Sequence, residues 1–205
     1  MTSVAIIDDH AVVRMGIRYG IERSGIFAFA GEYASGEGAA AFVYAKKPDV
    51  VLLDIRMPGK DGLAALEEIL LAWPQAKVLM LTTSDADDDV YRALKLGAKG
   101  YLLKDRDSGD IFKAIETVAA GGKFIPSEIK ALYDSRRMMP DLTPRESEVL
   151  ALTVADKTNE EIAGLLGISR NGAKMHMRSL FDKFDVRDRV GLVTEAIRRG
   201  FAKPS

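Results

Sequence analysis

Four consecutive apolar residues end in an aspartate in the stretch Val50-Val51-Leu52-Leu53-Asp54. A second run of the same kind, Val4-Ala5-Ile6-Ile7, ends in Asp8-Asp9. Short β-type apolar runs that alternate with amphipathic helical stretches indicate a parallel sheet flanked by helices. We therefore predict an α/β fold whose strands deliver carboxylates to one edge of the sheet.

The same alternation extends outward from these two runs, from residue 4 to about residue 121. Strands are expected at five places: Val4–Ile7, Phe27–Glu32, Val50–Leu53, Val78–Leu81 and Gly100–Leu103. Helical patterns lie between and after them, near residues 11–23, 37–46, 62–72, 86–97 and 108–120. This fivefold βα pattern predicts a flavodoxin-like (βα)5 domain with a parallel sheet over residues 1–122.

The pattern changes after Gly122. Residues 123–141 form a mixed polar segment with Pro126 and Pro140 near its ends, which we interpret as a linker that is partly helical. From Leu142 onward only helical patterns remain, near residues 144–155, 159–166, 170–184 and 188–199. Residues 142–205 are therefore predicted to form a small all-α domain of four helices.

Composition agrees with two soluble domains. Of 205 residues, 47% are apolar and 29% are charged, so each unit can bury a core of its own. The absence of cysteine excludes disulfides and cysteine-based zinc or redox sites. We find neither a basic leader nor a membrane-length apolar stretch, and expect a cytoplasmic protein without membrane contact. The net charge is −1, so any argument for nucleic-acid binding must be local.

Three carboxylates are expected to meet at the sheet edge. In the flavodoxin-like order the first and third strands are neighbours, which brings Asp8, Asp9 and Asp54 together outside their carboxyl ends. Three such groups within about 4–6 Å repel each other by several kcal/mol, so they must protonate or bind a cation. Oxygen ligands, with no histidine or cysteine expected nearby, favour Mg²⁺, which also binds phosphate oxygens.

Two further side chains end strands on the same edge. Lys104 follows Leu102-Leu103, and Thr82 follows Leu79-Met80-Leu81. Lysine supplies a compact positive charge and threonine a hydroxyl donor, and both suit phosphate oxygens. The pocket is therefore predicted to accept a phosphoryl group.

In contrast, the acidic run Asp85, Asp87, Asp88 and Asp89 is expected only to complement a helix dipole outside the pocket.

A known family shares this arrangement. The shared positions are Asp8-Asp9, Asp54, Met57-Pro58-Gly59-Lys60-Asp61-Gly62, Thr82, Tyr101 and Lys104. On these residues the chain resembles the receiver domain of response regulators over residues 1–122. The resemblance implies that Asp54 is the phosphoacceptor, attacking a phosphohistidine or a small acyl phosphate. It also implies that Asp9 and Asp54 bind Mg²⁺ directly, Asp8 mostly through water, with the Arg56 backbone carbonyl as a further ligand.

The resemblance makes Thr82 and Tyr101 the switch that reports phosphorylation. Taken singly, several of these residues have simpler interpretations. Asp8-Asp9 could cap a helix, Lys104 could be solvated, and Tyr101 could serve packing alone. All of them occur in register on one fivefold βα pattern, and this favours the pocket.

The second domain marks its helix starts with capping residues. Thr143-Pro144-Arg145-Glu146 places Thr at the N-cap, Pro at the first position and Glu at the third, and Thr158-Asn159-Glu160-Glu161 repeats the capping box. Gly167-Ile168-Ser169 then makes a tight turn in which Ser169 can cap the next helix. Two short helices joined in this way predict a helix-turn-helix. The second helix is expected to turn four apolar residues inward: Ile162, Ala163, Leu165 and Leu166.

The helix over residues 170–184 carries a local basic stripe. Spacing by four places Arg170, Lys174 and Arg178 on one face, near Met175 and His176. Its core residues are expected to be Met177, Leu180, Phe181 and Phe184. Such a helix fits the major groove, where Lys and Arg contact guanine and methionine can touch a thymine methyl. Flanking groups, including Asn159 and the helix start at Ser169, are expected to hold phosphates.

Residues 142–200 resemble the LuxR-type DNA-binding domain, and the whole chain is similar to the NarL/FixJ group of response regulators. The positions that carry this resemblance are Leu142-Thr143-Pro144-Arg145-Glu146, Asn159-x-Glu161-Ile162-Ala163, Leu166-Gly167-Ile168-Ser169, Lys174-x-His176 and Arg189. The resemblance implies that Lys174, Met175 and Arg178 face bases and that the last helix makes the dimer contact. Two positions depart from the family's pattern. Gly172-Ala173 stands where Thr-Val usually precedes the lysine, and a glycine within a helix costs about 1 kcal/mol relative to alanine. Asp156 stands where a glycine is common.

The expected function is that of a two-component transcriptional regulator, not an enzyme with external substrates. A sensor histidine kinase would phosphorylate Asp54, and a homodimer would then bind promoter DNA, with RNA polymerase as a candidate partner. One alternative is a DNA-binding regulator that works without phosphorylation and keeps a vestigial pocket. A second is a haloacid-dehalogenase-type hydrolase, but those carry an aspartate two residues after the nucleophile, where this chain has Arg56.

Overall fold

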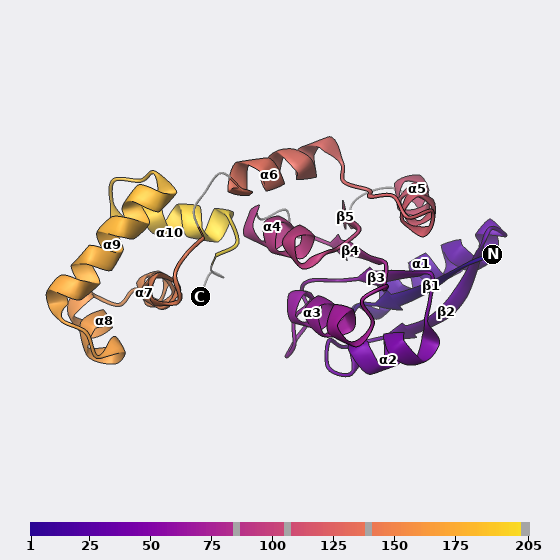
Figure 1. Ribbon diagram of the computed structural model, residues 1–205, viewed down its shortest axis with the longest axis horizontal. Coiled ribbons are helices and arrows are strands. Elements are labelled where there is room, and N and C mark those ends of the chain that lie inside the picture. The colour runs from indigo at the N-terminus through magenta and orange to yellow at the C-terminus, as the bar shows by residue number, and fades with distance from the viewer. Residues whose placement is uncertain (84–86, 105–107, 138–140, 202–205) are drawn as a thin grey trace. The chain divides into compact units, whose positions relative to one another are not determined.

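A computed structural model describes residues 1–83, 87–104, 108–137 and 141–201. The chain divides into two compact units that meet in sequence between Tyr133 and Asp134. Each unit has the predicted class of fold, an α/β sheet domain followed by a helical domain (Figure 1). None of the described helices is long and apolar enough to span a bilayer.

The first unit contains a five-stranded parallel sheet in the order β2-β1-β3-β4-β5. Its strands are β1 (Thr2–Ile7), β2 (Phe27–Tyr33), β3 (Val50–Leu53), β4 (Val78–Thr82) and β5 (Gly100–Leu103). All five expected strands are confirmed, with bounds that differ by no more than two residues. The order places β1 beside β3, as the acidic-pocket argument requires, and Ile7 pairs with Leu53 at their ends.

Helices cover both faces of this sheet. They are α1 (Ala11–Ser24), α2 (Ala39–Lys46), α3 (Gly62–Ala72), α4 (Asp87–Leu96) and α5 (Ser108–Ala119). Successive residues of a strand point to opposite faces, so Ile6 and Leu52 pack with α1 and α5 while Ile7 and Leu53 pack with α2, α3 and α4. Burial on both faces explains why the strands are continuous apolar runs.

Part of the expected linker belongs to the first unit. Phe124 forms a parallel bridge with Gly100 of β5, and helix α6 (Ser127–Arg137) follows. Ile129 of α6 is 1% exposed and lies in the same buried cluster as α3 and α4, while the ring of Tyr133 stacks on Tyr91 at 5.7 Å. The first compact unit therefore continues to Tyr133 rather than stopping near Gly122.

The second unit contains the four expected helices, at nearly the predicted positions. They are α7 (Pro144–Val154), α8 (Asn159–Leu166), α9 (Arg170–Phe184) and α10 (Arg189–Arg198). Both predicted capping boxes form, at Thr143 with Glu146 and at Thr158 with Glu161. The core lies between the helices and includes Leu150, Ile162, Leu180, Phe184 and Leu192.

One core expectation in this unit is wrong. Leu165 of α8 is 63% exposed, whereas Ile162 and Ala163 are buried and Leu166 is partly buried. The reason is the helix period: Ile162 and Leu166 are four residues apart and share the inner face, and Leu165 lies off that face.

Candidate functional site: an acidic phosphoryl pocket and a helix-turn-helix

The pocket forms because two neighbouring strands end at the same level. The backbone N–H of Asp54 donates to the carbonyl of Ile7 at 2.9 Å, which places Asp54 directly beside the end of β1. Asp8 and Asp54 are each 2% exposed. Asp8, Asp9 and Asp54 each offer a ligand atom within 4.8 Å of the others, so the expected clustering of the three carboxylates occurs.

Lys104 supplies a positive charge between two of these carboxylates. Its Nζ lies 2.7 Å from Oδ2 of Asp54 and 2.7 Å from Oδ2 of Asp8. The residue reaches the pocket because the backbone N–H of Lys104 donates to the carbonyl of Thr82, which aligns the ends of β5 and β4. Thr82 is fully buried at that end. Lys104 is thus held by the pocket and is not simply solvated.

Two carboxylate oxygens of the pocket lack a hydrogen-bond donor among the described residues: Oδ1 of Asp54 and Oδ1 of Asp9. Buried anionic oxygens without donors are costly, and a bound cation removes that cost. The donor set therefore fits Mg²⁺, with Asp9 and Asp54 as the side chains able to hold it.

The pocket contains a histidine, His10, that was not expected there from the sequence. Nδ1 of His10 lies 2.9 Å from Oδ1 of Asp9 and 3.3 Å from Oδ1 of Asp8. His10 is also the N-cap residue of α1, but its side chain makes no capping bond. Asp8 and Asp9 do not occupy the cap position, so the capping interpretation of this pair does not hold. The signal for His10 was available, because it directly follows Asp9 in the chain.

The loop after Asp54 is shaped by its own residues. Asp61 caps α3 by accepting a hydrogen bond from the Ala64 backbone at 2.9 Å. A Cβ at Gly62 would lie 1.9 Å from the carbonyl oxygen of Asp54, so only glycine lets α3 start this close to the pocket. Gly59 has a positive φ of 73°. Gly59 and Gly62 therefore meet backbone requirements of the loop that follows Asp54.

Arg56 lies in this loop, where its backbone carbonyl is the further metal ligand implied by the resemblance. Its guanidinium makes an ion pair with Asp89 of α4, whose side chain is 5% exposed. The expectation that Asp89 only complements the helix dipole is therefore wrong, because it is a buried partner of the pocket loop. Asp85 and the side chain of Asp87 lie outside the described residues.

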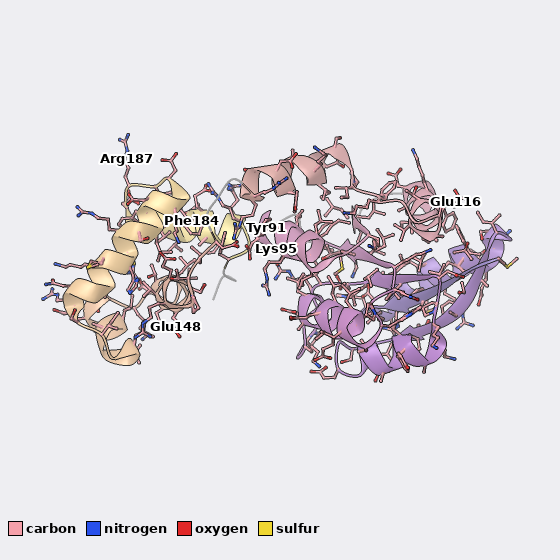
Figure 2. The ribbon with its side chains drawn as sticks, viewed as in Figure 1. Tyr91, Lys95, Glu116, Glu148, Phe184 and Arg187 are labelled. Carbon is pink, nitrogen blue, oxygen red and sulfur yellow. The ribbon has the colours of Figure 1, made fainter. Side chains whose placement is uncertain are left out.

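Tyr101 is fully buried on the face of the sheet covered by α4 and α6. It pairs with Met80 of β4, in the same cluster as Ile129 of α6. Tyr91 and Lys95 lie on α4 (Figure 2), the helix that contributes Val90 and Ala93 to this cluster. The candidate switch residue thus shares a buried cluster with helix α6, a relation that no sequence pattern indicated.

In the second unit, α9 presents the predicted basic residues on its outer surface. Lys174, Met175 and Arg178 are exposed, Met175 by 73%. With Asn159 and Arg187 they line a hollow of ≈ 950 Å³. Figure 2 shows Arg187 pointing away from the unit at the end of α9. Arg187 was not among the predicted contacts, and it lies just beyond the end of α9.

Of the other four residues that were predicted to contact DNA, Arg170 and Ser169 already make bonds within the protein. Arg170 forms an ion pair with Glu160 at 2.7 Å, both well exposed. Ser169 caps α9, as expected, by accepting from the Gly172 backbone at 3.0 Å. His176 is half-buried. Asn159 has a buried Oδ1 without a hydrogen-bond partner among the described residues.

An anionic side chain holds α7 against α9. Glu146 is 5% exposed and accepts hydrogen bonds from Lys183 at 2.6 Å and Ser179 at 2.7 Å. Burial alone would raise the pKa of Glu146, but the bonds from Lys183, the Thr143 backbone and Ser179 lower it to about 2. The charged form of Glu146 therefore holds helix α9 against α7.

A parallel-sheet domain with this pocket, followed by a helix-turn-helix, defines a two-domain response regulator. The family model of the response regulator receiver domain matches residues 4–116, and that of bacterial regulatory proteins of the luxR family matches residues 140–196. The chain therefore belongs to the response regulators that carry a LuxR-type DNA-binding domain, and it is a transcriptional regulator by family.

Its relatives match over nearly the whole length. The transcriptional regulatory protein DegU of Brevibacillus brevis is 32% identical over 98% of this chain and 94% of DegU. The response regulator VraR of Staphylococcus aureus is 34% identical over 95% of this chain and 96% of VraR. A structure of RcsB from Salmonella enterica serovar Typhimurium, bound to promoter P1flhDC with the phosphomimetic BeF3⁻, has a TM-score of 0.74 and 27% identity, covering 95% and 97% of the two chains.

Proposed function

We propose that Asp54 accepts a phosphoryl group from a sensor histidine kinase and that this modification controls dimerisation and sequence-specific binding of promoter DNA. The observation that carries the proposal is the state of the Asp54 carboxylate. One oxygen, Oδ2, is held by Lys104, and the other, Oδ1, is buried and has no donor among the described residues. A carboxylate that a lysine holds in place, and whose second oxygen is open to a cation, is suited to nucleophilic attack on a phosphoryl group.

In the proposed step, a carboxylate oxygen of Asp54 attacks the phosphorus of a phosphohistidine or an acyl phosphate. An O–P bond forms as the P–N or P–O bond to the donor breaks, and the bonding electron pair leaves with the donor group. Lys104, which contacts the carboxylate before the reaction, balances the added negative charge. Bound Mg²⁺, held by Asp9, Asp54 and the carbonyl of Arg56, would supply charge neutralisation at the phosphoryl oxygens.

The conformational change that follows phosphorylation is proposed to begin at the ends of β4 and β5. A phosphoryl group on Asp54 adds charge next to Thr82 and Lys104. Lys104 directly follows β5, the strand of the buried Tyr101, and Thr82 ends the neighbouring strand β4. Movement of Thr82 toward the group would change the packing around Tyr101, and so the surface formed by α4 and α6. This surface change would favour the homodimer.

The output is proposed to be DNA recognition by α9, with Lys174, Met175 and Arg178 at base edges. Arg170, His176, Asn159 and Ser169 are proposed at or near phosphates. The RcsB structures with DNA support this, and two of them were obtained with a phosphomimetic. A dimer through α10 would bind half-sites of inverted symmetry, with RNA polymerase as a further partner and the cytoplasm as the place of action.

The decisive experiment compares the wild type with Asp54→Asn after incubation with acetyl phosphate and Mg²⁺. Intact mass reports phosphorylation, sedimentation reports dimerisation, and fluorescence anisotropy reports affinity for promoter DNA. The wild type should gain one phosphoryl group, dimerise and bind DNA more tightly, and Asp54→Asn should do none of these. Asp61→Asn is the matched control, because asparagine still caps α3 and the charge change is the same. Equal responses from the wild type and Asp54→Asn would instead support the regulator with a vestigial pocket.

A further inference from the structure

His10 is placed as if it belonged to the acidic pocket rather than to helix α1. Its backbone N–H donates to Oδ1 of Asp8 at 2.9 Å, which fixes the residue at the end of β1. Its side chain makes no cap for α1, and the ring instead approaches the carboxylates of Asp8 and Asp9. The imidazole therefore adds a nitrogen donor to a set of oxygen donors.

The ammonium group of Lys104 compensates the negative charge on only one side of the pocket. Lys104 contacts the Oδ2 atoms of Asp8 and Asp54. Among the described residues, no donor reaches the buried Oδ1 of Asp54 or Oδ1 of Asp9, although Nδ1 of His10 lies only 2.9 Å from the latter. That short approach is not aligned as a hydrogen bond. Three carboxylates and one ammonium leave two negative charges, which a divalent cation would neutralise.

The separations match the coordination shell of a small cation. Adjacent ligands at right angles around an ion with bonds near 2.1 Å are about 3.0 Å apart. Nδ1 of His10 lies 2.9 Å from Oδ1 of Asp9 and 3.3 Å from Oδ1 of Asp8, and one donor atom from each of these residues and Asp54 lies within 4.8 Å of every other. Four side chains can therefore share one ion without a large rearrangement.

We propose that His10 is a direct ligand in this pocket, which makes it a mixed nitrogen and oxygen site that binds divalent first-row transition ions, such as Mn²⁺, Co²⁺ and Zn²⁺, more tightly than Mg²⁺. Imidazole favours these ions, whereas Mg²⁺ prefers oxygen ligands alone. The inference deepens the proposed function, because such an ion would occupy the same pocket that receives the phosphoryl group. Its test, however, needs no phosphoryl donor.

The test is metal binding to the full chain by isothermal titration calorimetry with Mg²⁺, Co²⁺ and Zn²⁺, for the wild type and His10→Ala. The side chain of His10 does not cap α1, and circular dichroism melting would verify that the variant folds. His176→Ala is the matched control, because His176 is the only other histidine of the chain. A side-chain ¹⁵N spectrum with Zn²⁺ reports directly whether Nδ1 of His10 binds the ion.

We expect His10→Ala to lose roughly tenfold or more in affinity for Co²⁺ and Zn²⁺, while its Mg²⁺ affinity changes by less than about twofold. His176→Ala should leave all three affinities unchanged, and the Nδ1 signal of His10 should shift on adding Zn²⁺. The inference is overturned if His10→Ala keeps the wild-type preference between Co²⁺ and Mg²⁺, or if that signal does not move. Phosphorylation of Asp54 with Mg²⁺ could still occur in that case, so the two proposals fail separately.

Discussion

The backbone N–H of Tyr101 donates a hydrogen bond to the carbonyl oxygen of Phe124, at 3.0 Å. The chain beyond the last receiver helix α5 therefore returns to the edge strand β5 and lies beside the candidate switch residue. Helix α6 follows at once, and its Ile129 joins the buried cluster that contains Tyr101. In this chain, residues 124–133 of the segment between the two domains are thus part of the receiver core.

If α6 belongs to that core, Ile129→Ala should destabilise the first unit. Ile129 is 1% exposed, and truncating a buried isoleucine to alanine costs about 2–4 kcal/mol. Urea denaturation followed by the fluorescence of Trp73, the only tryptophan, measures the loss in this unit. Lys130→Ala, at the exposed neighbouring position, should change stability by less than about 0.5 kcal/mol. A small effect of Ile129→Ala would mean that α6 is a detachable linker.

Lys104→Ala should make the first unit dependent on divalent cations for its stability. The side chains of Asp8 and Asp54 are almost fully buried, and removing the partner of a buried charge costs about 3–5 kcal/mol. Thermal melting in EDTA should show most of this loss, and Mg²⁺ should recover part of it by replacing the missing charge. Lys113→Ala, on the exposed surface of α5, is the control. An identical loss in EDTA and in Mg²⁺ would contradict the cation argument.

Arg178→Ala and Lys174→Ala should weaken promoter binding. A side chain that contacts a base contributes about 1–3 kcal/mol and affects sequence preference, whereas one that contacts phosphate lowers the salt slope by about one. Anisotropy titrations over a range of salt concentrations distinguish the two roles. Lys157→Ala removes the same charge as Lys174→Ala from a residue outside α9, and it should have little effect on affinity. The recognition-helix assignment fails if all three variants bind DNA equally.

Acid should loosen the second unit through Glu146. The pKa of Glu146 is lowered from 4.5 to about 2 in the folded chain, so its stabilisation is present above pH 4.5 and is lost as the pH falls toward 2. The shift corresponds to roughly 3 kcal/mol. Amide hydrogen exchange of α7 and α9 between pH 5 and pH 2.5 would show this, and Glu146→Gln should remove most of the pH dependence. Glu148→Gln, exposed on the same helix, should keep it.

The glycine inside the recognition helix can be compared with a second helical glycine. A Cβ at Gly164 of α8 meets nothing within 4 Å, so Gly164→Ala should stabilise the unit by about 0.5–1 kcal/mol. A Cβ at Gly172 would lie 3.3 Å from Oγ of Ser169, which caps the same helix, so Gly172→Ala should gain less. Thermal melting of both variants measures the difference. An equal or larger gain for Gly172→Ala would show that the Ser169 cap adjusts freely.

Local sequence was sufficient for the elements of this protein. The apolar runs at Val4–Ile7 and Val50–Leu53 lie buried in β1 and β3, and the capping boxes at Thr143 and Thr158 form as predicted. The φ of Asp156 is 57°, which is the left-handed conformation that a glycine adopts easily. These features depend on residues close together in the chain, and for that reason they can be recognised from pattern and spacing.

The sequence by itself determined the class of fold, the five parallel strands, the helix-turn-helix and the three carboxylates at one edge, because strand direction alone carries those residues to that edge. Tertiary structure decided the rest. Only packing placed Ile129 in the same buried cluster as Tyr101 and Asp89 against Arg56, and only the turn into α1 brought the ring of His10 to the carboxylates of the pocket. These contacts depend on how the helices and loops pack against the sheet. Such packing is determined by the complementary shapes of side chains from several segments, and it cannot be read from the hydrophobic period of any one segment.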